Sequence, residues 1–451
     1  MLSKSLACFA LGELEERILK VSIATYRVEA LSVRACLVYC AIFWLGACGQ
    51  DEAAVQQSTV VKTRYLEKVT PIVYHLDNPA CTREQALADL GHVQIWVRNL
   101  QQQHQLVEVD LSGYGGVGLL GPGIVAAYGQ GEWRELATEA GRGHLALENS
   151  GNPLFLCAHS GPYSVHSYEN RTLASLASIA MAYRYYNGVR QAQSNLTSSI
   201  NLPPVKLFID AKVSHCAQKT TAELVCEYNV DNAFYAEGSS AYIVLTQASE
   251  QLRDTFLAQA QPYFHLHETL GVLAHEYGHL VFAHHTSALA GLVDAASDKQ
   301  AVQRLLMAIN EGWADLFAAA ALQEEDPQQG RLIFYQNILE RDVYSPLLDS
   351  GQRKRFIPAQ LKAYTRMLDS APERILDPHR VGAILAYNIA LRERLFFSQS
   401  VLSHTAQRQQ AGHKLLAWAE HLASGIVFTQ WAETALTEPE ESMRFLLSLF
   451  W

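Results

Sequence analysis

The feature that most restricts the fold of this chain is a pair of histidines inside a stretch with the apolar spacing of an amphipathic helix. His275 and His279 lie four residues apart, and Glu276 directly follows the first of them. Four residues make about 1.1 helical turns, so both imidazoles project from the same face of the helix expected over residues 268–283. Such a helix needs a second element that meets this polar face.

A second amphipathic helix, expected over residues 301–323, carries Glu311 and Asp315 one turn apart. Glu311 can complete a His₂Glu set with His275 and His279, which is a set that binds Zn²⁺ and leaves one coordination position for water. Asp315 is then expected to accept a hydrogen bond from the outer ring nitrogen of a ligating histidine. The alternative is a chance match on two surface helices.

These segments carry a resemblance to a known family. HEYGH at residues 275–279, followed by NEGWAD at residues 310–315, resembles the gluzincin zinc metallopeptidases. The stretch from Glu311 to Phe317 looks most like the fungalysin branch, with the thermolysin family as its relative. The resemblance covers about residues 172–391. It implies an α+β, thermolysin-like two-lobe metallopeptidase with a β-containing N-terminal lobe, a mainly helical C-terminal lobe and the active-site helix between them.

The resemblance also assigns residues outside the two helices. NAFY at residues 232–235 is similar to the edge strand that holds an extended substrate, so Asn232 and Ala233 would contact a peptide. DPHRVG at residues 377–382 is similar to a segment whose histidine stabilises the tetrahedral intermediate. That role falls to His379, with Asp377 as its orienting partner. The alternatives are plain sheet core for the first segment and a helix start capped by Asp377 for the second.

The expected chemistry is hydrolysis of peptide bonds. One Zn²⁺ per chain would polarise the scissile carbonyl and lower the pKa of its water toward ~7. Glu276 would take the proton of that water and pass it to the leaving amine. The family's second transition-state donor, a Tyr or Arg, is not assigned to a residue of this chain, and no calcium is predicted. The next two histidines, His284 and His285, are expected to form a solvated helix end, because adjacent residues rarely share a tetrahedral metal.

The N-terminal segment predicts export. Residues 35–47 form an apolar run that is too short to span a bilayer and is preceded by Arg34. The run ends in LGAC, which resembles a bacterial lipobox and makes Cys48 the expected lipidation site. The chain is therefore expected to be an exported lipoprotein, periplasmic or at the cell surface, with an N-terminal lipid anchor in the outer membrane. The alternative is a buried apolar helix.

Cysteine usage agrees with an oxidising compartment. Beyond Cys48 there are four cysteines, an even number, and none has metal-site spacing. Three pairings are open. The favoured pairing joins Cys216 to Cys226 across a hairpin and leaves Cys81 with Cys157.

Composition excludes several classes of protein. Of the 451 residues, 49% are apolar and 18% are charged, which is typical of a globular chain rather than a disordered or polytopic membrane protein. The formal net charge of −10 argues against a nucleic-acid partner, because phosphate binding needs clustered Lys and Arg. A peptide or protein substrate is the expected partner.

Four regions are expected along the chain. A leader with a lipobox covers residues 1–47, and a β-rich region follows over residues 48–164, with one helix near residues 82–100. A catalytic lobe with the substrate strand and the HExxH helix covers residues 165–290. A helical C-terminal lobe covers residues 291–451.

Two functions from different classes are compatible with these patterns. The first is an active zinc metalloendopeptidase. The second is a catalytically silent lipoprotein that keeps the metallopeptidase fold as a binding or scaffold module. The complete ligand set and the retained Glu276 favour the first.

Overall fold

The structure is a computed structural model, and it describes part of the chain. The described residues are 62–66, 81–98, 103–129, 131–137, 143–148, 152–159, 161–165, 167–192, 201–220, 223–229, 232–237, 240–247, 266–289, 291, 299–322, 343, 346, 353–354, 377–392 and 404–424. The predicted leader and Cys48 lie outside them.

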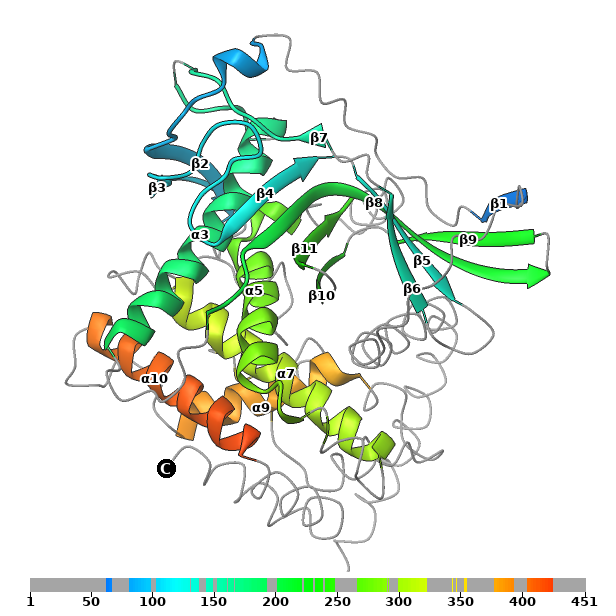
Figure 1. Cartoon of the computed structure of the whole chain (residues 1–451). Coiled ribbons are helices and arrows are strands. Elements are labelled where there is room, and N and C mark those ends of the chain that lie inside the picture. The colour runs from blue at the N-terminus through cyan, green and yellow to red at the C-terminus, as the bar shows by residue number, and fades with distance from the viewer. Residues whose placement is uncertain are drawn as a thin grey trace, which may run out of the picture. The chain divides into compact units, whose positions relative to one another are not determined.

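Strands dominate the first half of the described chain and helices the second, as the predicted α+β class requires (Figure 1). The strands are β1 (Lys62–Leu66), β2 (His92–Arg98), β3 (His104–Asp110), β4 (Ile124–Gly129), β5 (Glu132–Ala137), β6 (Gly143–Glu148), β7 (Asn152–Pro153), β8 (Val205–Thr220), β9 (Glu223–Asn229), β10 (Ala233–Glu237) and β11 (Ala241–Thr246). The α-helices are α3 (Tyr168–Ala192), α5 (Leu270–His285), α7 (Lys299–Leu322), α9 (Pro378–Arg392) and α10 (His404–Ala423). Two 3₁₀ turns, η1 (Arg83–Gln85) and η2 (Leu266–Glu268), complete the set.

One long strand, β8, organises the larger sheet. Its first half pairs in parallel with β4 and β11, and its second half pairs with β5 and β9. The change of partners falls near Asp210, whose φ of 54° marks an irregular point in the strand. Arg171 on α3 meets the buried Asp210 carboxylate at 3.2 Å. The sheet thus draws its strands from both sides of residue 164.

The hairpin of β10 and β11 ends this sheet on the side of α5. The described strands run in the order β1-β9-β8-β11-β10, so β10 is an edge strand with one side of its backbone turned away from the sheet. Both strands contact α5. The edge strand expected at residues 232–235 is confirmed as a strand.

The helix predicted near residues 82–100 is wrong over most of its length. Only η1 is helical, and the segment continues into β2, which pairs with β3 in a separate two-stranded sheet. The alternating apolar residues Val93, Ile95 and Val97 suit a strand with one buried face, and Ile95 and Val97 are buried. This alternating pattern predicts a strand more strongly than the preceding residues predict a helix.

Helix α5 runs through the core between α3, α7 and the β10–β11 hairpin. All its residues but Ala283 and His284 are buried, which is why it is apolar on every face except where its ionisable residues lie. Helix α7 is similar: its stretch Val302–Leu322 is long and apolar enough to cross a membrane, yet 89% of the most apolar window is buried. It is a core helix of the described fold.

Candidate metal centre

The two histidines of α5 lie on its face toward α7. The ring centroids of His275 and His279 are 4.4 Å apart and nearly perpendicular. Only 1% of His275 and 9% of His279 are exposed. The one-turn spacing therefore produces the shared face expected from the sequence, and packing against α7 removes that face from solvent.

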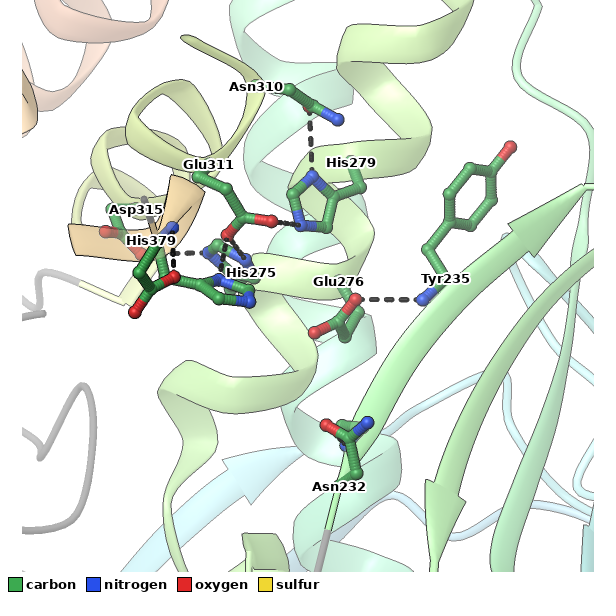
Figure 2. A network of polar contacts seen from close by, with 11 residues as sticks. Asn232, Tyr235, His275, Glu276, His279, Asn310, Glu311, Asp315 and His379 are labelled. Carbon is green, nitrogen blue, oxygen red and sulfur yellow. Dashed lines mark hydrogen bonds and ion pairs between the residues drawn. The ribbon is translucent and has the colours of Figure 1, made fainter. Parts of the chain in front are cut away.

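Glu311 on α7 completes the cluster. Its Oε2 lies 3.3 Å from Nε2 of His275, and its Oε1 lies 3.6 Å from Nε2 of His279. One ligand atom from each of the three side chains falls within 4.8 Å of the others, and all three residues are buried. No second group of this kind occurs in the part of the chain that the structure describes. These three residues can hold a metal ion (Figure 2).

The outer ring nitrogen, Nδ1, of each histidine contacts a residue of α7. Nδ1 of His275 lies 2.9 Å from Oδ1 of Asp315, and Nδ1 of His279 lies 3.0 Å from Oδ1 of Asn310. Asn310 can accept a hydrogen bond from Nδ1 of His279, and the Asp315 carboxylate lies at ion-pair distance from Nδ1 of His275. A hydrogen on each Nδ1 would leave Nε2 for a metal ion. Sequence analysis missed this role of Asn310. Its position directly before Glu311, on the helix expected to face His279, was the available signal.

The donor set fits a metal ion. Two imidazole nitrogens and a carboxylate converge on one buried point, where a cation between them would offset the buried negative charge. Burial, with His275 nearby, lowers the pKa of His279 and favours its neutral form. Burial alone would raise the pKa of Glu311, but His379, His279 and hydrogen bonds from His275 and His379 hold it well below its usual value. The histidine is thus neutral and the carboxylate charged, which are the forms that bind metals.

Glycines let the helices that carry this cluster approach closely. A Cβ on Gly278 of α5 would lie 3.0 Å from Cα of Ala314 on α7. A Cβ on Gly312 of α7 would lie 2.6 Å from the carbonyl oxygen of Gly382 on α9, and one on Gly382 would lie 2.6 Å from Cβ of Glu311. Side chains at these positions would push the helices apart and displace the carboxylate.

Glu276 projects from α5 toward β10 rather than into the cluster. Its Oε2 accepts a hydrogen bond of 2.9 Å from the backbone N–H of Tyr235, and only 7% of the residue is exposed (Figure 2). The carboxylate therefore lies between the ligand cluster and the edge strand. A base for water at the cluster would need this position.

His379, at the start of α9, reaches the cluster from the opposite side. Its Nδ1 lies 2.7 Å from Oε2 of Glu311, and 40% of its side chain is exposed. Asp377 contacts the backbone rather than the ring of His379. Its Oδ1 accepts from the His379 N–H at 2.9 Å and its carbonyl oxygen accepts from the N–H of Val381, which caps α9. The structure thus brings His379 to the centre and shows Asp377 as a helix cap.

Asn232 and Ala233 lie at the start of the edge strand beside α5. The Asn232 N–H donates to Oγ1 of Thr246 on β11, and Oδ1 of Asn232 accepts from the N–H of Ala233. Both residues are partly exposed. Their predicted contact with a peptide stays a prediction.

The helix end after the ligands is not solvated as predicted. His285 is buried, and its Nε2 lies 3.0 Å from the hydroxyl of Tyr186 on α3. Burial, with Arg190 and His284 nearby, lowers the pKa of His285 to about 4. Only His284 is partly exposed. The expectation failed because α3 and α10 cover the end of α5, which its own sequence does not reveal.

Both disulfides of the favoured pairing are present. Cys216 and Cys226 lie directly opposite each other on β8 and β9, and Cys81 is joined to Cys157.

Comparison with known proteins adds no relative. No family model matches the chain, and no curated protein is significantly similar to it.

Proposed function

We propose that this protein is a zinc metalloendopeptidase of the gluzincin type, with a thermolysin-like arrangement of its two lobes. The single observation that supports this most is the convergence of His275, His279 and Glu311 on one buried point, with the Glu276 carboxylate between this cluster and β10. Two nitrogens, one carboxylate and a free position are the ligand pattern of catalytic rather than structural zinc sites.

Each residue around the centre has its own proposed role in the reaction. A bound zinc ion supplies Lewis acidity to the substrate carbonyl and lowers the pKa of water. Glu276 accepts the proton of the attacking water and passes it to the leaving amine. His379, partly exposed at the rim, donates a hydrogen bond to the developing oxyanion. The edge strand β10, with Asn232 and Ala233, pairs with an extended peptide.

The export proposal has separate support. Two disulfides cross-link the described part of the chain, and disulfides persist in oxidising compartments. We therefore propose that the protein is exported and carries its lipid on Cys48. Mass measurement of the N-terminal peptide of the protein from membranes, with a diacylglyceryl addition at Cys48, tests this.

Peptide hydrolysis with matched variants tests the enzyme proposal. Wild-type protein is expected to cleave casein or a quenched peptide library, to hold zinc at one per chain, and to lose activity with 1,10-phenanthroline. Glu276→Gln should keep the zinc and lose about a hundredfold or more in kcat. Glu108→Gln, an exposed carboxylate of the separate β2–β3 sheet, is the control and should behave as wild type.

Two outcomes contradict the proposal. Hydrolysis by a zinc-loaded Glu276→Gln protein at the wild-type rate would remove Glu276 from the mechanism. Zinc at one per chain, with no cleavage of any peptide in the library, would favour the silent binding module.

A further inference from the structure

The general base proposed above is fixed in place by the backbone of the strand proposed to bind substrate. We infer that the backbone N–H of Tyr235 is a positioning group for Glu276, an inference that rests on the proposed peptidase function. The direction of the Glu276 carboxylate depends on a donor from β10 as well as on the helix that carries the motif.

The geometry of β10 explains why this amide is available. The Thr246 N–H donates to the carbonyl oxygen of Asn232, so the backbone of Asn232 faces β11. Backbone direction alternates along an antiparallel strand, so the polar groups of Tyr235 face away from β11. Since β10 is the last strand on its side of the described sheet, that direction leads to α5 and Glu276. The Tyr235 N–H donates there at 2.9 Å.

This contact restricts the carboxylate in two ways. A hydrogen bond to Oε2 restrains rotation about the last side-chain bond and keeps this oxygen on the side of β10. Burial adds to this restraint, because only 7% of Glu276 is exposed and the carboxylate has little solvent to turn toward. The aromatic ring of Tyr235 points away from the carboxylate, so only the backbone of this residue contributes (Figure 2).

The position of the proposed base therefore depends on the position of the proposed substrate strand. A displacement of β10 moves the Tyr235 amide, and the amide moves the carboxylate. We expect that removal of this single N–H lowers kcat more than it changes KM, because ground-state binding to β10 uses other groups of the strand.

Amide hydrogen exchange tests the contact without any catalytic readout. With ¹⁵N-tyrosine labelling of the full chain, the Tyr235 amide should be protected in wild type although it lies on the outer side of an edge strand. Glu276→Ala should speed its exchange by about tenfold to a hundredfold, the range for a lost hydrogen bond to a charged acceptor. Glu276→Gln keeps an acceptor oxygen and should retain most protection. Tyr242 on β11 reports on the rest of the hairpin under the same label.

A backbone ester tests the effect on catalysis. Replacing Tyr235 with its α-hydroxy acid by nonsense suppression removes the N–H and keeps the side chain. The expected result is a loss of about tenfold or more in kcat with KM within about twofold. The same ester at Val244, opposite Phe234 and with its N–H directed to β10, is the control for a weakened hairpin and should keep kcat near the wild-type value.

The outcomes separate the two proposals. Unchanged exchange at Tyr235 in Glu276→Ala, or equal loss of kcat in both ester proteins, overturns the positioning role. A rise in KM alone would show that the amide serves the substrate instead, and this also overturns it. Wild-type protein that protects the Tyr235 amide but cleaves no peptide overturns the peptidase function while supporting the contact.

Discussion

Oδ1 of Asp315 lies 2.9 Å from Nδ1 of His275, on the side of the ring opposite Glu311. Asp315 is fully buried, as is the ring it contacts. A carboxylate behind a ligating imidazole fixes the ring and makes the other nitrogen a better donor. Asn310 holds the ring of His279 in the same manner, but through a neutral amide.

Removal of this carboxylate should weaken metal binding. Asp315→Asn keeps an acceptor for the ring but loses the charge, and we expect zinc affinity to fall by about tenfold to a hundredfold. Competition with a chromophoric chelator measures the affinity. Asn310→Ala should also weaken binding, and by less, because no charge is lost. Unchanged affinity in both variants would show that the rings need no support from α7.

Removal of the metal should lower stability as well as activity. A ligand that binds only the folded state stabilises it by about 2.7 kcal/mol at a concentration of 100 Kd. We therefore expect the melting temperature to fall by several degrees after dialysis against a chelator and to recover when zinc is added. Glu311→Gln should lose this dependence on zinc. An identical melting curve with and without metal would argue against a site at this cluster.

A side chain at Gly312 should destabilise the protein, because α7 and α9 cross closely at this position. In Gly312→Ala the new Cβ would lie 2.6 Å from the carbonyl oxygen of Gly382, so the helices must separate. We expect a loss of about 1–3 kcal/mol in unfolding free energy, with weaker zinc binding because Glu311 is next in the chain.

Gly188→Ala is the matched control for this crossing. Gly188 lies in α3 with nothing within 4 Å of an added Cβ, so alanine should be neutral or stabilising by up to about 1 kcal/mol. Chemical denaturation and chelator competition measure both effects. If Gly312→Ala were as stable as the control, the close approach would not matter.

Stability should fall with pH through the titration of His285. Its pKa is lowered to about 4 by burial, with Arg190 and His284 adding to the effect. The hydroxyl of Tyr186 and the carboxylate of Glu420 also face its ring. The unfolded chain takes up the proton near pH 6.5 and the folded chain only near pH 4, so stability is fully present above pH 6.5 and is lost as the pH falls toward 4.

The expected loss from this residue is about 3 kcal/mol between these limits. Denaturant unfolding at a series of pH values measures it, and His285→Gln should flatten the curve between pH 6.5 and 4. A variant curve as steep as that of wild type would assign the acid sensitivity to other groups.

The sequence alone determined the parts of the centre that depend on local spacing. Two histidines one helical turn apart must share a face whatever surrounds them, and so must Glu311 and Asp315. Apolar periodicity located α5 and α7 to within two residues of their observed ends. The hairpin position of Cys216 and Cys226 likewise made their pairing predictable.

Only the tertiary structure decided the contacts between elements distant in sequence. The bond from Tyr235 to Glu276, the close approach of Gly312 to Gly382 and the burial of His285 each join residues on different elements. Periodicity shows which face of an element is buried but not which neighbour covers it. Neighbours follow from the packing of the whole fold, because each buried polar group must find its partner wherever the chain brings one.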